Sequence, residues 1–372
     1  MNQHTKKRLA VTFAALIAAL AACEGLLRWQ QRLGPFVELA DLRADLDESL
    51  VASAITHHRR GRSQDEVTTS TIPAGCVSAD RTVRILFLGD SWMYEGGIVE
   101  GFGRHASPLV GPGVCLELLN GGVPSFAPSL MLVEGLRLID RHHPDLVVAN
   151  IDESDLMDET VRYKPYVIRD ARGAIERVSA PAMALRLAAL QETGMTAIES
   201  HPLYVVRLAV KAYYVGLFPL LGKLTDPVAM TWNQYALMFG PQLSRNPRET
   251  HRAAIDYFDG ILEEFVPRLS TALGSPNRLM ITHHPHYLGV KELRSARNYN
   301  DVVSEIVREV CLKYGVTWYD ATTDTGRLYG ADFPHYFRWP QDTFSHLTHE
   351  GFLRYGEAIA DRARDSLAVL IE

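Results

Sequence analysis

Residues 84–91 read Arg-Ile-Leu-Phe-Leu-Gly-Asp-Ser, an apolar run that ends abruptly in a glycine, an aspartate and a serine. The run has the length and composition of a buried strand, and Gly89-Asp90 is typical of the turn that ends one. We therefore expect the Ser91 hydroxyl just past the carboxyl end of a strand, where open α/β sheets bind ligands. A serine there is either a nucleophile or the cap of the next helix, since serine is a preferred N-cap residue.

Strand-like and helical stretches alternate from Thr82 to the end of the chain. Such alternation predicts an α/β fold with a parallel sheet covered by helices on both faces. Residues from about 160 to 245 interrupt it with many aromatics and prolines, which indicates an insertion that shapes a pocket, docks to a partner or caps the surface. The expected strands are Val83–Leu88, Val114–Leu119, Leu146–Ile151, Leu279–Thr282 and Val316–Tyr319, and the expected helices include Ser129–His142, Thr250–Leu273 and Asn298–Lys313.

Length and composition exclude several classes of protein. A chain of 372 residues with 47% hydrophobic and 22% charged residues can bury a large core. The net charge of −6 offers no basic surface for nucleic acid. The four cysteines do not have the spacing of metal ligands. We therefore predict no nucleic-acid partner, no metal site and no cofactor.

The N-terminus has the pattern of an export or anchoring segment. The basic cluster Lys6-Lys7-Arg8 precedes the apolar stretch Leu9–Leu27, which is close to the roughly 20 residues that span a bilayer. A signal-anchor over residues 1–28 in the inner, cytoplasmic membrane is one interpretation. A lipoprotein signal processed at Cys23, after Leu20-Ala21-Ala22, is a second, and a cleaved secretory peptide is a third. The remaining alternative is a hydrophobic helix inside the cytoplasm.

Each export interpretation places the body of the protein outside the cytoplasmic membrane. Residues 29–80 are then a stalk and linker, and residues 81–372 form the main domain. An oxidising compartment permits disulfides. We expect a Cys76–Cys115 bridge, with two separate buried thiols as the alternative, and place Cys311 in the core.

Polar or glycine-rich segments follow the later strands as well. The second expected strand leads into Asn120-Gly121-Gly122-Val123-Pro124, where glycines allow a backbone N–H to face a cleft without a nearby Cβ. The third leads into the acidic run that contains Ser154 and Asp155. Near the C-terminus, Asp342 and His346 lie in a loop before an amphipathic helix.

This ordered set resembles the SGNH (GDSL-type) hydrolase superfamily, in its membrane-anchored bacterial form, over roughly residues 82–370. The matching residues are Phe87-Leu88-Gly89-Asp90-Ser91, Asn120-Gly121-Gly122-Val123-Pro124, and His346-Leu347-Thr348 with Gly351. The resemblance implies a flavodoxin-like doubly wound sheet with Ser91 as nucleophile, His346 as base and Asp342 as the acid. It also implies that the N–H groups of Ser91 and Gly122 stabilise the oxyanion.

Two positions depart from the family pattern. Ser154 stands where the family usually has an asparagine that donates to the oxyanion, and we expect its hydroxyl to donate instead, with Asn150 as the alternative. Thr343 stands where the family usually has the acid, three residues before the histidine. Asp342 is one residue further away, and a dyad without a strong acid is the alternative.

Other polar residues have weaker claims on the site. Three histidines, His283, His284 and His286, follow the fourth expected strand. We expect His283 and His286, with Asp155, to contact substrate, and a metal site or a structural loop is the alternative for the three histidines. His349 is a rival base, but the spacing to Gly351 favours His346.

These residues predict an extracytoplasmic serine esterase that removes acyl groups, such as acetyl, from a glycan or a small ester. The first alternative is an O-acyltransferase that acts on a cell-envelope or secreted polysaccharide and receives the acyl group from a membrane acyl-donor protein. The second alternative is a catalytically weak glycan-binding or assembly protein with the same fold.

Overall fold

The computed structural model describes residues 12–28 without 14, 16 and 27, then 68–72, 81–178 without 112, 124 and 125, then 203, 205–206, 252–284, 299–337 and 346–371. The chain divides into two compact units. The smaller unit combines Met1–Ser53 with Pro181–Trp232, and the larger unit combines Ala54–Ala180 with Asn233–Glu372.

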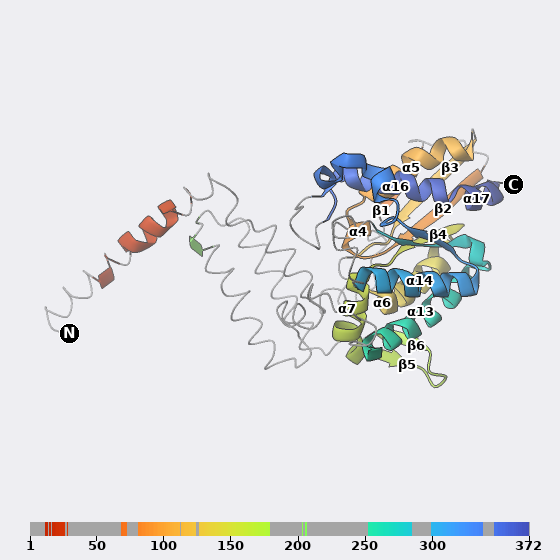
Figure 1. Cartoon of the computed structure of the whole chain (residues 1–372), viewed down its shortest axis with the longest axis horizontal. Helices are drawn as coiled ribbons and strands as arrows, with labels where there is room; N and C mark the ends of the chain where they lie inside the picture. The colour runs from red at the N-terminus through yellow and green to blue at the C-terminus, as the bar shows by residue number, and fades with distance from the viewer. Residues whose placement is uncertain are drawn as a thin grey trace. The chain divides into compact units, whose positions relative to one another are not determined.

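The larger unit is built on a six-stranded sheet in the described part of the chain, with the order β1-β3-β2-β4-β7-β8 (Figure 1). Counted in chain order, the five strands after β1 are arranged 2-1-3-4-5 and pair in parallel, which is the flavodoxin-like doubly wound order. The predicted α/β class and parallel sheet are thus confirmed. These strands are β2 (Arg81–Leu88), β3 (Val114–Asn120), β4 (Leu146–Asn150), β7 (Leu279–His283) and β8 (Thr317–Asp320).

The edge strand β1 (Thr68–Ile72) was not expected from the sequence. It pairs antiparallel with β3, from Thr68 opposite Asn120 to Ile72 opposite Leu116. We predicted a stalk and linker over residues 29–80, and residues 61–80 in particular are rich in serine, threonine and glycine. An edge strand does not need the apolar run of a central strand, which explains the difference.

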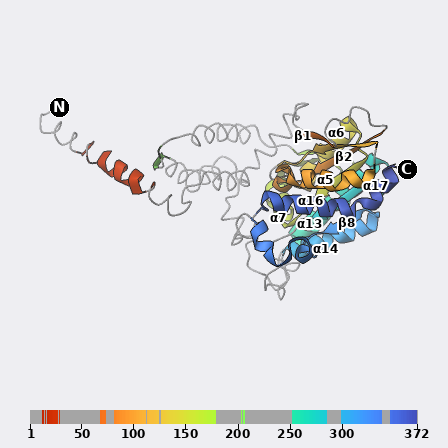
Figure 2. The same cartoon turned by 90° about the horizontal axis from the view of Figure 1, so that it is seen from above.

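Helices cover both faces of the sheet (Figures 1 and 2). On one face α5 (Gly97–Val110) packs with α16 (His349–Arg362) and α17 (Arg364–Ile371). On the other face α13 (Arg252–Leu273) packs with α6 (Pro128–His142) and α14 (Tyr299–Tyr314). All residues of β4 and β7 are buried, as expected for strands covered on both sides.

Helices α5 and α16 cross at unusually short range. A β-carbon added at Gly101 would lie 2.1 Å from the Leu353 carbonyl oxygen, and one added at Gly356 would lie 2.1 Å from the Ile98 oxygen. Only glycine fits at these two positions because the neighbouring atoms belong to the backbone. The crossing holds α16, which follows His346, against α5, which follows Ser91.

The described part of the predicted insertion begins with a π-helix, η1 (Asp158–Tyr163), and a short 3-10 turn, η2 (Lys164–Tyr166). A hairpin of β5 (Val167–Arg169) and β6 (Ile175–Val178) follows. Most of the region up to residue 245 lies outside the described residues.

In the smaller unit, described residues between 12 and 28 are helical. Within this unit the Val205 N–H donates to Glu24 at 2.8 Å. Among the described residues, no helix is both long enough and apolar enough to cross a membrane.

The cysteines of the described chain fall into two groups. Cys115 on β3 is disulfide-bonded, whereas Cys23 and Cys311 are free thiols. Cys76 lies outside the described residues, so the Cys76–Cys115 pairing stays a prediction. Cys311 is buried on α14, in the core where we predicted it.

Candidate active site

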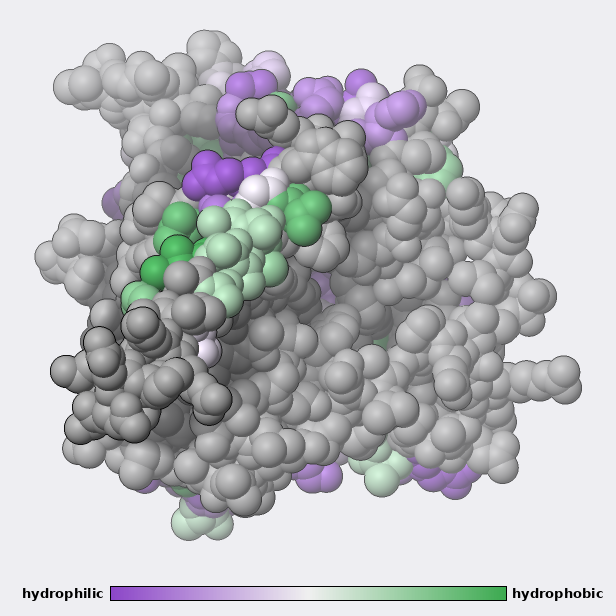
Figure 3. Space-filling view, turned by 90° about the vertical axis from the view of Figure 1, so that its left-hand side faces the viewer, coloured by the Kyte–Doolittle hydropathy of each residue, from purple (hydrophilic) through white to green (hydrophobic). Residues whose placement is uncertain are grey.

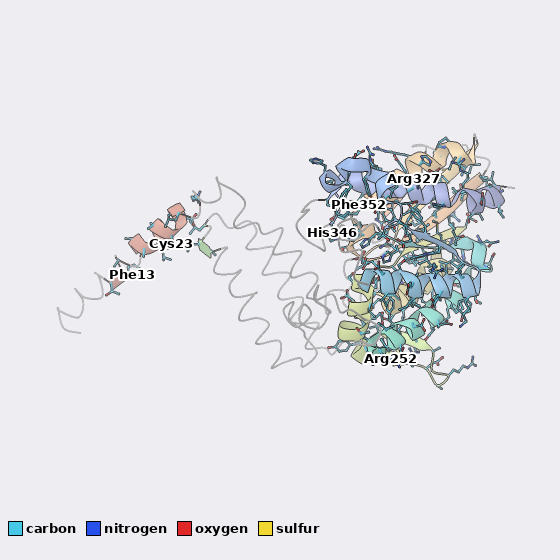
Figure 4. All side chains as sticks on the ribbon, in the orientation of Figure 1. Phe13, Cys23, Arg252, Arg327, His346 and Phe352 are labelled. Carbon is cyan, nitrogen blue, oxygen red and sulfur yellow. The ribbon has the colours of Figure 1, made fainter. Side chains whose placement is uncertain are left out.

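Ser91 and His346 meet at the carboxyl edge of the sheet. Ser91 begins the short helix α4 (Ser91–Tyr94) directly after β2, and its Oγ lies 2.7 Å from His346 Nε2. The site lies between β2 and β4, where the order of the parallel strands reverses and α/β sheets bind ligands. Figure 4 labels His346 beside Phe352, in the same region where Figure 1 labels α4.

Asp90, and not Ser91, caps α4. The Asp90 Oδ1 accepts the Trp92 N–H at 2.9 Å, and Asp90 itself is buried. The capping role that was the alternative for Ser91 therefore belongs to its neighbour. The Ser91 hydroxyl points to His346 instead, with Asp90 Oδ2 a more distant partner at 3.4 Å.

The two residues that follow His346 hold it in place. Leu347 is fully buried and forms a β-bridge with Phe337, and the Thr348 N–H donates to the Tyr336 carbonyl at 2.7 Å. The Thr348 side chain then caps α16. The rival base His349 has a 66% exposed side chain whose Nε2 lies 3.5 Å from Glu100 on α5, whereas the ring that contacts Ser91 is His346.

The segment after β3 packs directly against α4. A β-carbon at Gly122 would lie 2.5 Å from the Tyr94 nitrogen, so the segment approaches α4 this closely only because residue 122 is glycine. The Asn120 side chain donates to the Met93 carbonyl and accepts the Gly122 N–H, both at 2.9 Å. The N–H that we predicted as an oxyanion donor therefore donates to the Asn120 side chain in this structure.

Ser154 lies in the first turn of α7 (Glu153–Met157), just past β4. Asp152 caps this helix by accepting the Ser154 N–H at 2.6 Å, and Asp155 completes the capping box by accepting the Asp152 N–H at 2.8 Å. The Ser154 side chain is half-buried. Asn150, the alternative donor, is fully buried, and its Oδ1 accepts the Tyr355 hydroxyl at 2.9 Å.

The two buried aspartates of this box have opposite pKa shifts. Burial, together with the charges of Asp152 and Asp90, raises the pKa of Asp155 well above its usual value. Burial alone would also raise the pKa of Asp152, but the adjacent His284 outweighs it, so the pKa of Asp152 lies well below its usual value. Asp152 is thus ionised at neutral pH.

The structure gives His283 and Asp155 structural roles instead of the substrate contacts that we predicted. His283 is fully buried, and its Nδ1 lies 2.8 Å from the Ile151 carbonyl oxygen. Asp155 is buried in the capping box. His283 is the last residue of the fully buried strand β7, and Asp155 lies in the first turn of α7, where its side chain is taken up by the box. His286 and the predicted acid Asp342 lie outside the described residues.

Sequence reasoning assigned no role to Trp92 and considered His284 only as one of the three histidines after the fourth expected strand. The rings of these two residues stack, with centroids 3.5 Å apart and planes 3° apart, and Trp92 also stacks with His346. His284 Nε2 lies 2.5 Å from Asp152 Oδ2. The position of Trp92 directly after Ser91 was the only sequence signal, because the partners come from distant segments.

Among known proteins, solved structures are similar to this chain. No protein-family model and no curated sequence matches the chain. An α/β hydrolase enzyme, LAE5, from the metagenome of Lake Arreo, Spain, matches with 13% identity and a TM-score of 0.42, over 79% of this chain and 97% of that one. Axe2, an acetylxylan esterase from Geobacillus stearothermophilus, matches with 12% identity and a TM-score of 0.39, over 76% and 94%. A GDSL-like lipase from Bacteroides thetaiotaomicron matches with 11% identity and a TM-score of 0.33, over 86% and 98%. Similarity at this level carries no argument about activity, which must be inferred from the site itself.

Proposed function

We propose that this chain is an SGNH-type serine esterase that forms an acyl-enzyme at Ser91. The observation that carries the proposal is the 2.7 Å contact between Ser91 Oγ and His346 Nε2. A serine hydroxyl is a weak nucleophile until an adjacent base accepts its proton, and this distance suits that transfer. The position of the pair at the strand-order reversal supports the same conclusion.

The reaction follows from this geometry. His346 Nε2 takes the proton of Ser91 Oγ while the oxygen attacks the ester carbonyl carbon. The tetrahedral intermediate collapses when the bond to the leaving alkoxide breaks, and the imidazolium protonates that oxygen. Water, activated by His346, then hydrolyses the acyl-enzyme and restores Ser91. Asp342 stays our proposed partner for the second nitrogen of the imidazole.

The oxyanion of the intermediate needs hydrogen-bond donors near Ser91. We assign this role to the N–H groups of Ser91 and Gly122 and to the Ser154 hydroxyl. The close approach of Gly122 to α4 and the place of Ser154 at the start of α7 support the assignment. Each such donor contributes on the order of 3 kcal/mol to stabilisation of the transition state.

An exposed aromatic side chain near the nucleophile supports an acylated glycan as substrate. Tyr94 is 61% exposed and lies three residues after Ser91 on α4, so the two share one face of the helix. A flat ring in this position gives the apolar face of a sugar a surface to pack on. Tyr94→Ala should then raise KM for an acetylated oligosaccharide and leave KM for p-nitrophenyl acetate unchanged.

We also propose that the N-terminal helix attaches the protein to the cytoplasmic membrane, with the larger unit outside the cytoplasm. Large apolar side chains on this helix are exposed, and Figure 3 shows hydrophobic side chains gathered on its visible surface. They are Phe13, Ile17, Leu20 and Leu26. The disulfide-bonded state of Cys115 fits an oxidising compartment. Carbonate-resistant membrane association of the full chain, lost when residues 1–28 are deleted, is the expected result.

Turnover of p-nitrophenyl acetate by the full chain in mild detergent, with and without an acceptor oligosaccharide, tests the activity. Fast release in water alone is the result expected for an esterase. Release that requires the acceptor and yields acylated sugar would instead assign the acyl-enzyme to an O-acyltransferase. Neither turnover nor labelling by a fluorophosphonate would contradict the proposal and favour a glycan-binding protein. Ser91→Ala is the control for background hydrolysis.

A further inference from the structure

Three aromatic side chains surround the indole of Trp92, which is only 5% exposed. His284 is parallel to it at 3.5 Å, and His346 lies with its centroid 5.6 Å away and its plane inclined by 27°. Phe352 contacts it edge-on at 5.5 Å. The indole therefore has a fixed orientation, and one of the rings that it stacks with is the base that we assign to the reaction.

His284 is in turn held by a buried carboxylate. Its Nε2 lies 2.5 Å from Asp152 Oδ2, and both side chains are almost completely buried. Asp152 is itself fixed because it caps α7. A continuous set of contacts thus runs from α7 through Asp152, His284 and Trp92 to His346. The members come from four separate segments of the chain, so ordinary helix or strand packing does not require the arrangement.

We propose that Trp92 is a positioning residue whose indole stabilises the imidazolium form of His346 and that His284, anchored by Asp152, holds the indole in place. The inference rests on the proposed function, since His346 must act as the base. A cation within about 6 Å of an indole centroid is attracted by the negative face of the ring, and tryptophan is the best aromatic partner. His346 at 5.6 Å meets this condition.

The proposal makes a prediction that a purely structural role does not. His346 is neutral before the reaction and becomes charged as it takes the Ser91 proton. The indole therefore acts more strongly on the transition state than on the bound substrate, so its loss should lower kcat and leave KM nearly unchanged. The acid limb of the pH profile of kcat/KM should also move to lower pH, because the imidazolium is less stable without the indole.

The experiment compares Trp92→Leu and Trp92→Phe with the wild-type full chain and with the control Trp318→Leu. Trp318 is a half-buried tryptophan that lies near His283, with ring centroids 6.1 Å apart, and makes no stacking contact with His346 in the described structure. For Trp92→Leu we expect kcat about three- to tenfold lower. We expect the midpoint of the acid limb about half a pH unit lower in the same variant. Trp92→Phe should move both quantities in the same direction by less, and Trp318→Leu should move neither.

His284→Gln tests the second half of the proposal. A glutamine amide keeps a hydrogen bond to Asp152 but removes the flat ring behind Trp92. We expect this variant to lower kcat with little change in KM and to shift the acid limb as Trp92→Phe does. Wild-type kcat in His284→Gln would overturn the supporting role of His284.

The outcomes separate this inference from the proposed function. If the wild-type chain neither turns over the ester nor reacts with a fluorophosphonate, the proposed function fails first. If the wild type is active and folded Trp92 variants keep its kcat and its acid limb, the inference is wrong while the esterase assignment stands. Far-ultraviolet circular dichroism identifies folded variants, and Trp92→Phe decides the result if Trp92→Leu does not fold.

Discussion

The backbone of Gly356 on α16 passes so close to Ile98 on α5 that a β-carbon at Gly356 would lie 2.1 Å from the Ile98 carbonyl oxygen. Helix α5 follows the nucleophile and α16 follows the base, so this contact fixes the distance between the two halves of the site. Gly356→Ala should therefore separate the helices, because a backbone oxygen cannot move aside as a side chain can. We expect a loss of about 3 kcal/mol in the free energy of unfolding. We also expect kcat to fall up to roughly 100-fold as His346 moves from Ser91.

Gly260→Ala is the matched control. Gly260 is an exposed glycine inside helix α13, and an added β-carbon meets no atom within 4 Å. Alanine there should raise the free energy of unfolding by roughly 0.5–1 kcal/mol and leave kcat unchanged. Urea unfolding and turnover of p-nitrophenyl acetate measure both effects. Equal effects of the two substitutions would contradict the role of the helix crossing.

The Asn120 side chain should prove necessary for catalysis although it does not reach the substrate. It donates to the Met93 carbonyl and accepts the Gly122 N–H, so it ties the segment after β3 to α4 beside Ser91. Asn120→Ala removes both hydrogen bonds and should lower kcat about tenfold, which corresponds to about 1.4 kcal/mol. If Asn120 instead competes with the oxyanion for the Gly122 N–H, kcat will rise, and the proposed role of Asn120 will be wrong.

Ser154→Ala separates catalysis from stability at one position. The capping box uses the Ser154 backbone N–H and the side chains of Asp152 and Asp155, so the hydroxyl is not part of it. We expect kcat to fall by about 100- to 1,000-fold if the hydroxyl donates to the oxyanion, with the free energy of unfolding changed by less than about 0.5 kcal/mol. Ser154→Asn, which supplies the amide usual in the resembled family, should restore activity. Wild-type kcat in Ser154→Ala would remove the third donor from the mechanism.

The nucleophile and its base could be predicted from the sequence because their motifs, each weak alone, occur in the order of the resembled family. Ser91 follows a buried apolar strand, and His346 precedes an amphipathic helix at a recognisable distance from Gly351. The structure brings the two together across 255 positions. The five parallel strands were predicted because each contains a short run of mostly apolar residues between turn-forming or helical segments.

The edge strand β1 and the roles of His283 and His284 could not be predicted, because they depend on contacts between distant segments of the chain. β1 has a polar sequence and becomes a strand only because the edge of β3 is open to pairing. His283 and His284 are adjacent in sequence, yet one bonds a backbone carbonyl and the other joins Asp152 to Trp92. Sequence alone could not distinguish these histidines from substrate-binding ones.

Glu159 should make the stability of the larger unit depend on pH. It is fully buried at the start of α6, where one oxygen accepts the Ser129 N–H at 2.6 Å and the other has no hydrogen-bond partner among the described residues. Burial raises the pKa of Glu159 from 4.5 to about 7. Between these values the folded protein keeps a proton that the unfolded chain releases, so stability falls as pH rises from about 4.5 to 7 and then levels off. The loss amounts to roughly 3 kcal/mol.

Glu159→Gln removes this titration and keeps an acceptor for Ser129. The variant should match the wild type in free energy of unfolding near pH 4.5 and exceed it by roughly 3 kcal/mol at pH 8. Urea unfolding at several pH values measures the difference. A difference between variant and wild type that does not change with pH would show that Glu159 titrates outside this window.

Labelling with a fluorophosphonate, followed by mass spectrometry of the modified peptide, tests the central claim most directly. The reagent reacts with a serine whose proton an adjacent base accepts, which is the role assigned to His346 at 2.7 Å from Ser91. The account predicts one adduct, on Ser91, in the wild-type chain, none in Ser91→Ala, and much slower labelling in folded His346→Ala. An unlabelled Ser91 in the folded wild-type chain, or undiminished labelling in His346→Ala, would contradict it.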